Sequence, residues 1–301
     1  MEQRTSATTP ATIGRPRRAA DRSRLEALID LLGDESPAVF ASVRDELLRA
    51  GPAALPQLRR AAESDDSRRR PRARHILIDH ERSAVMRRLL CYAARGSVDL
   101  EQALMLLSRL ERADFDARPY RRALDAFAAE VSKRLARERD ALARPMVLVH
   151  YLGEELGFAG AREDYHHPDN VYLHRAIERK SGMPLTLAAI YMLVARRVGL
   201  RAAALPLPGH VLLRLYADDS AMIVDPFSGG RLCTQEECLS YLARQGLKPQ
   251  PSWFHDASDD QLFQRQVMNL VQSFRLRGLG RSAHELYRLA LVLDNVRRGG
   301  S

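Results

Sequence analysis

The sequence is poor in cysteine and in aromatic side chains, and it has no long apolar run. Its 301 residues include 3 cysteines, and phenylalanine, tryptophan and tyrosine together make up 6%. Three scattered cysteines cannot form a disulfide framework, so we expect a reducing compartment. Nowhere do about eighteen uncharged apolar residues follow one another, which argues against a membrane-spanning helix. The scarcity of aromatic residues disfavours an all-β sandwich.

Lysine is also scarce, and arginine supplies almost all of the net charge of +9. Lys133, Lys180 and Lys248 are the only lysines among 47 basic residues. The arginines alternate with acidic residues along amphipathic segments, and no recognition helix, zinc finger or RNA-binding signature accompanies them. We therefore expect no nucleic-acid partner. The alternative, binding of nucleic acid through arginine, predicts an affinity that falls steeply with added salt.

The first third of the chain has the pattern of short helices. Residues 1–22 are polar and basic, and we expect a disordered tail there and a cytoplasmic protein. Apolar residues at helical spacing, interrupted by Gly and Pro turns, predict a helical region over residues 23–95. Its segment Gly51–Leu58 is similar to part of a HEAT repeat.

The remainder of the chain predicts an α+β fold that is mostly α-helical. A core over residues 96–250 combines helices with a short antiparallel sheet, and a helical hairpin over residues 258–297 is similar to a tetratricopeptide repeat. The core helices are expected at about 100–110, 117–138, 145–156, 186–198 and 234–245, the strands at 202–207, 210–216 and 221–224, and the hairpin helices at 259–277 and 281–296.

Two polar residues stand out on the predicted strands. His210 begins one strand and Asp225 follows the next, so the two side chains can meet across an antiparallel pair. A carboxylate in that position fixes the tautomer of an imidazole, as in the base-and-orienter half of a catalytic triad. A buried pair that only ties two strands together explains the same spacing equally well.

A series of motifs resembles the bacterial SirB family, which belongs to the transglutaminase-like superfamily. The resemblance covers about residues 97–295. The motifs, in chain order, are Gly157-Phe158, Asp164-Tyr165, Pro168-x-Asn170, Leu173, Gly182-x-Pro184-Leu185-Thr186-Leu187, Ala195-Arg196-Arg197-x-Gly199-Leu200, Pro208-Gly209-His210 and Asp225-Pro226-Phe227-x-Gly229-Gly230.

The resemblance implies a papain-like core whose active members carry a Cys, a His and an Asp. The His corresponds to His210 and the Asp to Asp225, whereas the Cys position holds Pro184, a replacement typical of the SirB family. Acyl transfer on this scaffold needs a thiolate at a helix N-terminus, and proline supplies none. Proline does suit the first turn of a helix, where its missing N–H costs nothing.

No other residue offers an obvious nucleophile or ligand set. Thr186 lies about 200° around the helix from Pro184, pointing away from His210, and a hydrogen bond to a backbone carbonyl explains its hydroxyl. Small thiols in ordinary packing explain Cys91, Cys233 and Cys238 better than a displaced nucleophile does. We expect no metal site at His166, His167 and Asp169, and no cofactor.

These observations predict a non-catalytic transglutaminase-like protein that works as an interaction or regulatory module with a protein or peptide partner. Its triad positions Pro184, His210 and Asp225 are vestigial, and Tyr165, Asn170, Thr186 and Gly209 form a possible pocket beside them. The alternative is an amide or ester hydrolase in which His210, oriented by Asp225, activates water as a general base.

Overall fold

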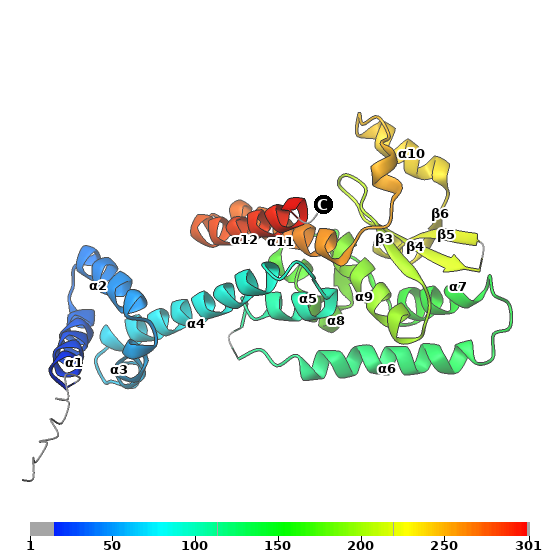
Figure 1. Cartoon of the computed structure of the whole chain (residues 1–301). Coiled ribbons are helices and arrows are strands. Elements are labelled where there is room, and N and C mark those ends of the chain that lie inside the picture. The colour runs from blue at the N-terminus through cyan, green and yellow to red at the C-terminus, as the bar shows by residue number, and fades with distance from the viewer. Residues whose placement is uncertain (1–14, 113, 219, 300–301) are drawn as a thin grey trace, which may run out of the picture. The chain divides into compact units, whose positions relative to one another are not determined.

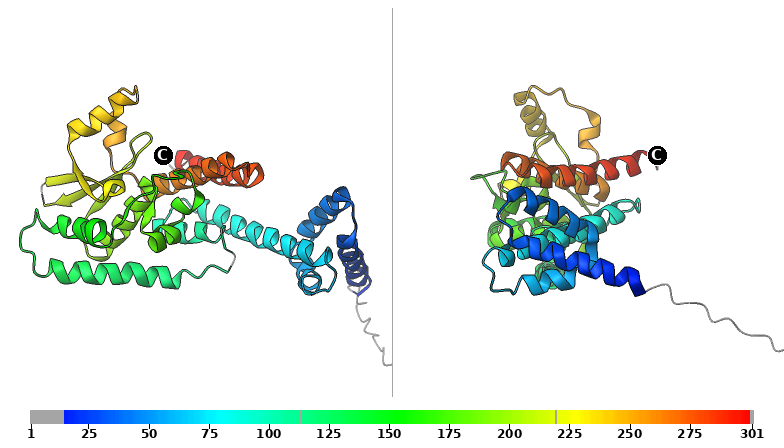
Figure 2. Two further views of the ribbon diagram at one scale, coloured as in Figure 1. Left: turned by 180° about the vertical axis from the view of Figure 1, so that it is seen from behind. Right: turned by 90° about the vertical axis from the view of Figure 1, so that its left-hand side faces the viewer.

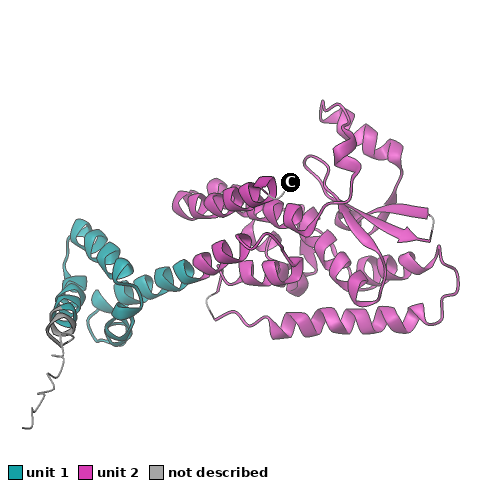
Figure 3. Ribbon diagram, in the orientation of Figure 1, with its two compact units in different colours: residues 1–84 teal, residues 85–301 magenta. Residues whose placement is uncertain are grey.

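The computed structural model describes residues 15–112, 114–218 and 220–299, with side chains from residue 21 onward. The chain divides into two compact units, residues 1–84 and residues 85–301 (Figure 3). The division falls within helix α4 (Arg69–Ala93), ahead of the boundary expected near residue 95. Residues 1–14 of the expected disordered tail lie outside the described residues. Arg15 to Arg22 belong to a helix instead, because their arginines and alanines favour helix.

The first unit is built of short helices that surround a small apolar core. Arg72 links α4 to the chain at residues 32–34. Its Nη1 donates to the carbonyl oxygen of Leu32, at 3.0 Å, and to that of Asp34. The guanidinium of Arg72 also lies over the Phe40 ring. Besides the start of α4, the helices are α1 (Arg15–Asp30), η1 (Leu31–Gly33), α2 (Pro37–Ala50), η2 (Gly51–Ala54) and α3 (Leu55–Ala61).

The second unit contains most of the helices and all of the strands in the described part of the chain (Figure 1). Its α-helices after α4 are α5 (Leu100–Ser108), α6 (Arg118–Leu135), α7 (Arg144–Val149), α8 (Leu173–Arg179), α9 (Pro184–Arg197), α10 (Gln235–Arg244), α11 (Asp259–Leu276) and α12 (Gly280–Gly299). Its shorter helical segments are η3 (His150–Glu155), η4 (Pro168–Asn170), η5 (Pro226–Ser228) and η6 (Pro251–Phe254).

The main sheet is an antiparallel meander of four strands in chain order. These are β3 (Ala202–Leu205), β4 (Leu212–Ala217), β5 (Ser220–Asp225) and β6 (Arg231–Cys233). Leu213 pairs with Val224, which sets the register of the two central strands. A second, parallel pair joins β1 (Ala159–Gly160) to β2 (Ser181–Gly182). The α+β, mostly helical class predicted from the sequence is confirmed.

Helix α9 lies at the centre of this unit. Every residue from Pro184 to Ala195 is buried, which explains why its sequence is apolar all round rather than amphipathic. It packs against α6, α8 and α11 and against the strands β3 and β4. The chain therefore holds the start of α9, at Pro184, in a fixed position beside the sheet.

The C-terminal helices α11 and α12 lie side by side in both Figures 1 and 2. A capping box between Ser258 and Gln261 starts α11. Apolar residues of α11, among them Phe263 and Leu270, are fully buried in the same core cluster as α9. The hairpin is thus part of the second unit rather than a separate body.

We find no helix in the described ranges that has both the length and the apolar character required to cross a membrane.

Candidate functional site

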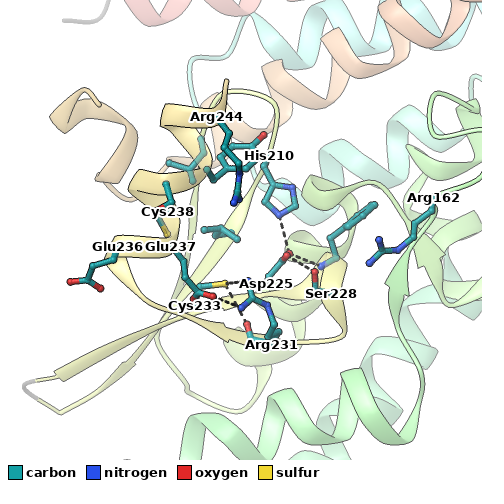
Figure 4. Close-up of a pocket in the computed structure, with 15 residues that line it drawn as sticks. Arg162, His210, Asp225, Ser228, Arg231, Cys233, Glu236, Glu237, Cys238 and Arg244 are labelled. Carbon is teal, nitrogen blue, oxygen red and sulfur yellow. Dashed lines mark hydrogen bonds and ion pairs between the residues drawn. The ribbon is translucent and has the colours of Figure 1, made fainter. Parts of the chain in front are cut away.

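His210 and Asp225 form a hydrogen-bonded pair at one end of the main sheet. His210 Nε2 lies 3.0 Å from Asp225 Oδ1, and Figure 4 shows the two side chains pointing toward each other. With the carboxylate ionised, Nε2 carries the proton and Nδ1 is left as a lone-pair acceptor. Nδ1 has no hydrogen-bond partner within the described ranges, and the His210 side chain is 18% exposed. The imidazole is therefore oriented and open to a ligand.

Asp225 is held as a carboxylate by three donors. Its Oδ1 accepts from His210 and from the Phe227 N–H at 3.0 Å, and its Oδ2 accepts from the Ser228 hydroxyl at 2.7 Å. Burial by itself would raise the pKa of this carboxyl, but these hydrogen bonds and the nearby imidazole outweigh it and hold the pKa below its usual value. An ionised Asp225 in turn fixes the tautomer of His210.

The turn before β4, rather than β4 itself, carries His210. The prediction that His210 starts a strand is wrong, because Pro208 and Gly209 form a turn that closes through a hydrogen bond from His210 N to Leu207 O. Gly209 adopts φ +74°, and a Cβ there would lie 2.9 Å from the Tyr241 hydroxyl. That hydroxyl donates to Pro208 O at 3.1 Å.

A second cluster of contacts holds the His210 turn from the side of α11. Arg265 Nη2 donates to Leu207 O at 2.6 Å and to His210 O at 2.9 Å. The turn is thus held by Tyr241 of α10 and by Arg265 of α11. Sequence reasoning missed both contacts.

Pro184 and His210 line one small cavity of about 230 Å³. Pro184 is the first residue of α9, and the preceding residue, Met183, makes no side-chain cap. Tyr165 and Gly209, two of the residues predicted to form a pocket, line the same cavity. Of the three predicted triad positions, His210 contacts Asp225 directly and shares a cavity with Pro184.

This arrangement of a buried helix, a histidine next to a strand and a following aspartate agrees with the family comparison. The family model described as "Transglutaminase-like superfamily" matches residues 118–268. The chain belongs to the transglutaminase-like superfamily. The matched segment holds all three triad positions, so they lie within the transglutaminase-like domain.

Curated relatives of this transglutaminase-like chain come from bacteria and animals. A UPF0162 protein of Xylella fastidiosa is 35% identical over 142 residues, which cover 47% of this chain and 50% of that protein. A UPF0162 protein of Pseudomonas aeruginosa is 31% identical over 154 residues, covering 50% and 56%. F-box only protein 21 of Mus musculus is 29% identical over 152 residues, covering 48% and 24%. The chain spans about half the length of these bacterial relatives. No solved structure matches it.

The two remaining predicted pocket residues of the transglutaminase-like domain, Asn170 and Thr186, lie in the core and line neither cavity next to His210. The Thr186 hydroxyl donates to Asn170 O at 2.9 Å and accepts from Gln266 Nε2 at 2.8 Å. The Asn170 side-chain amide donates to Asp164 O and Tyr165 O. These residues support the loop that carries Tyr165 rather than face a ligand.

His210 also borders a larger cavity of about 510 Å³ (Figure 4). His210, Asp225, Cys233 and Cys238 all line it. Burial raises the pKa of the Cys233 thiol to about 11 and also raises the pKa of Cys238. Within the described residues no hydrogen bond joins His210 to a cysteine. Arg231 Nη2 lies 3.6 Å from Cys233 Sγ, but burial outweighs its charge and keeps the pKa of this thiol raised.

The two neighbouring histidines of the histidine-rich segment have different surroundings. His167 Nδ1 accepts from Asp169 N at 3.1 Å and so caps η4. His166 instead lines the small cavity. No cluster of three His, Cys, Asp or Glu residues suited to a metal occurs in residues 15–112, 114–218 and 220–299.

Proposed function

We propose that this chain is a non-catalytic protein of the SirB type, which uses its transglutaminase-like domain as a cytoplasmic interaction or regulatory module for a protein or peptide partner. The observation that carries the proposal is Pro184, which begins α9 and lines the same cavity as His210. A proline there offers neither a thiol nor any other nucleophilic side chain.

The setting of the cysteines supports the same view. Cys233 and Cys238 are the thiols that line a cavity with His210, and their pKa values are raised rather than lowered. Asp225 raises both values further through its negative charge. A catalytic thiol needs a lowered pKa; Cys233 has a neighbouring cation in Arg231, but burial outweighs its effect.

The His210–Asp225 pair then serves as a fixed polar element of the site, in which His210 borders both cavities and Asp225 borders the larger one. His210 is held through its ring by Asp225 and through its backbone by Arg265. Such preorganisation is useful for binding as well as for catalysis, since it lowers the cost of ordering the site when a ligand arrives.

The experiment that tests the absence of catalysis compares the wild-type chain with His210→Ala and Asp225→Asn on a panel of amide and ester substrates. We expect the three proteins to release amine or alcohol at the same background rate, with no acyl adduct in the intact mass. A rate that depends on His210 would overturn the proposal.

The second claim of the proposal, that the chain binds a protein or peptide partner, is tested with the full chain. Deletion of α11 would disturb the domain, because this helix contributes core residues. Tyr287 and Leu291 of α12 are exposed apolar residues one helical turn apart. We expect Tyr287→Glu/Leu291→Glu to reduce co-purification of specific partners, while Leu142→Glu at another exposed site retains them. Equal recovery with both variants would show that the hairpin is only structural.

A hydrolase that uses water directly is the second candidate, and the free Nδ1 of His210 beside an ionised Asp225 favours it. A general base without a covalent nucleophile contributes about two to four orders of magnitude in rate. In this case His210→Ala and Asp225→Asn would both lose turnover on an identified substrate while keeping their fold.

A further inference from the structure

The small cavity beside His210 has an unusual charge balance. Its lining includes Arg265, His166 and His210 but no aspartate or glutamate. Tyr165 and Asn269 add further side chains that can donate hydrogen bonds. The unused donors of the cavity are therefore those of Arg265, and no carboxylate of the lining receives them, while the free Nδ1 of His210 is an acceptor.

Arg265 is the clearest sign of this imbalance. Its Nη2 group donates to two backbone carbonyls, whereas Nε and Nη1 have no hydrogen-bond partner in the described part of the chain. No carboxylate forms an ion pair with it there, and burial lowers the pKa of its guanidinium. A half-buried guanidinium without a counter-charge is costly, and the cost is relieved when an anion binds.

Arg265 also differs from its neighbours in this respect. Arg277, at the C-terminal end of the same helix, pairs with Asp164 at 2.6 Å, and Arg214 of β4 pairs with Asp256 at 2.6 Å. Carboxylates thus neutralise Arg277 and Arg214, whereas Arg162 and Arg244 at the larger cavity form no ion pair in the described part of the chain. Arg265 is left with three unused N–H donors, one on Nε and two on Nη1.

One residue of the lining, His166, has an unpaired buried nitrogen. Nδ1 of His166 is buried with no hydrogen-bond partner among residues that the structure describes. Buried polar atoms of native proteins are nearly always satisfied, by protein, by water or by a ligand. His166 lines the same cavity as Arg265, although its Nδ1 itself is buried.

We propose that Arg265 binds the carboxylate group of a ligand in this cavity, next to His210. This inference rests on the proposed function, since it gives the chemistry of what the non-catalytic site holds. A carboxylate is small, anionic and a pure acceptor, which matches the unused N–H donors of Arg265. The volume of about 230 Å³ is below the range of roughly 300–1,000 Å³ usual for drug-sized ligands, so it suits one end of a molecule.

The carboxylate can come from a small organic acid or from the C-terminus of a peptide. His210 lines both the small cavity and the larger one of about 510 Å³. A peptide whose terminal carboxylate reaches Arg265 can therefore place its preceding residues in the larger space. A small acid would fill the smaller cavity alone.

The test follows the Arg265 Nε–H resonance and the His210 ring resonances by NMR in the full chain. The probes are sodium acetate, a short peptide with a free C-terminus, the same peptide as its C-terminal amide, and inorganic phosphate. We expect acetate and the free-acid peptide to shift both sets of resonances to saturation, and the amide to bind at least about tenfold more weakly than the acid. Tighter binding of the peptide acid than of acetate identifies a chain terminus as the source, and equal binding identifies a small acid.

Arg265→Gln removes the charge, and Arg265→Lys keeps it. We expect the first to weaken binding about tenfold or more and the second to retain part of it. Arg281→Gln on the exposed face of α12 makes the same change of charge outside the site and should leave binding unchanged. Trp253 fluorescence and the ring resonances of His210 verify that each variant is folded.

Three results would overturn the carboxylate site. These are shifts that do not saturate with any carboxylate, saturation with phosphate alone, and equal loss of binding in Arg265→Gln and Arg281→Gln. His210-dependent turnover in the substrate assay would overturn the proposed function instead, without bearing on whether acetate binds at Arg265. The two failures are therefore distinguishable.

Discussion

Pro184 and His210 face one cavity, the first from the start of α9 and the second from the turn before β4. The two residues are 26 positions apart in the sequence, and α9, β3 and the Pro208–Gly209 turn bring them together. A side chain at position 184 thus has access to the space that borders the imidazole. This relationship makes position 184 the best place at which to test what the scaffold can still do.

Restoring a thiol at position 184 should produce an activated cysteine. In Pro184→Cys the new thiol would lie at the N-terminus of a 14-residue helix and beside an imidazole, and both favour the thiolate. We expect iodoacetamide at about pH 6.5 to alkylate the introduced thiol about tenfold or more faster than the exposed Cys91 of the same molecule, as measured by peptide mass spectrometry. Pro184→Cys/His210→Ala should lose most of this advantage. Equal rates at the introduced thiol and at Cys91 would show that the thiol does not reach His210.

The native cysteines near the site should be slow to react. Burial raises the pKa of Cys233 to about 11 and also raises that of Cys238, so near neutral pH both remain protonated. We expect alkylation of the folded chain to label Cys91 first and the other two at least about tenfold more slowly. Denatured protein, in which all three react alike, provides the control. Preferential labelling of Cys233 or Cys238 would revive the idea of a displaced nucleophile.

The Asp225 carboxyl should make the stability of the domain dependent on pH. Its pKa is lower in the folded chain than the value of about 3.9 in an unfolded one, so its contribution is complete above that value and is lost as the pH falls through the folded pKa. We expect Asp225→Asn to cost roughly 1–3 kcal/mol at about pH 7, with a smaller difference from wild type below about pH 4.

Urea unfolding followed by Trp253 fluorescence measures this effect, because Trp253 packs against the apolar cluster next to the site. Ser228→Ala removes a single hydrogen bond to Asp225 and should cost less, about 1 kcal/mol. A constant difference between Asp225→Asn and wild type from about pH 7 to about pH 3 would contradict the prediction.

Gly153 should tolerate no side chain, because the helical segment η3 lies against the turn that follows Asp225. A Cβ on Gly153 would lie 2.1 Å from the carbonyl oxygen of Gly229, and 3.0 Å from the Tyr191 hydroxyl. We expect Gly153→Ala to destabilise the domain by about 2 kcal/mol or more and to disturb the His210 ring resonances. Gly280→Ala at the open start of α12 is the matched control, since nothing lies within 4 Å of its Cβ. A Gly153→Ala variant as stable as Gly280→Ala would show that η3 can move away without cost.

The pairing of His210 with Asp225 could be predicted because local signals define it. Gly and Pro turns mark the ends of the strands, and an antiparallel meander places the end of β5 next to the start of β4. The side of α9 on which Thr186 lies was also predictable, because helical geometry fixes the angle around the helix axis between Thr186 and Pro184. Its hydroxyl does bond to backbone carbonyls, but they belong to residues 170 and 171 rather than to its own helix.

The contribution of α11 to the site could not be predicted in the same way. Arg265 contacts residues 55 and 58 positions earlier in the sequence, and no local pattern reports a contact of that kind. The residue next to Arg265, Gln266, did carry a sequence signal for a long-range polar contact of α11. Gln266 lies on the apolar stripe between Leu262 and Leu270, and it is fully buried, with a hydrogen bond to Thr186. A polar residue on a core stripe indicates a buried polar partner elsewhere in the chain.

Proline at position 184 removes a backbone group as well as a side chain. An acyl-transfer site stabilises the developing oxyanion with N–H donors, and the amide of the nucleophile itself is suitably placed to be one of them. Pro184 has no such amide, so if position 184 corresponds to the nucleophile, as we propose, the attacking group and one electrostatic stabiliser are both absent from a single position. Alanine at 184 would restore the donor alone, and cysteine would restore both. Comparing the alanine and cysteine variants therefore measures the effect of the attacking thiol separately from the effect of the N–H donor. Replacing the cysteine of an active enzyme by alanine removes only the thiol and cannot measure the effect of the donor.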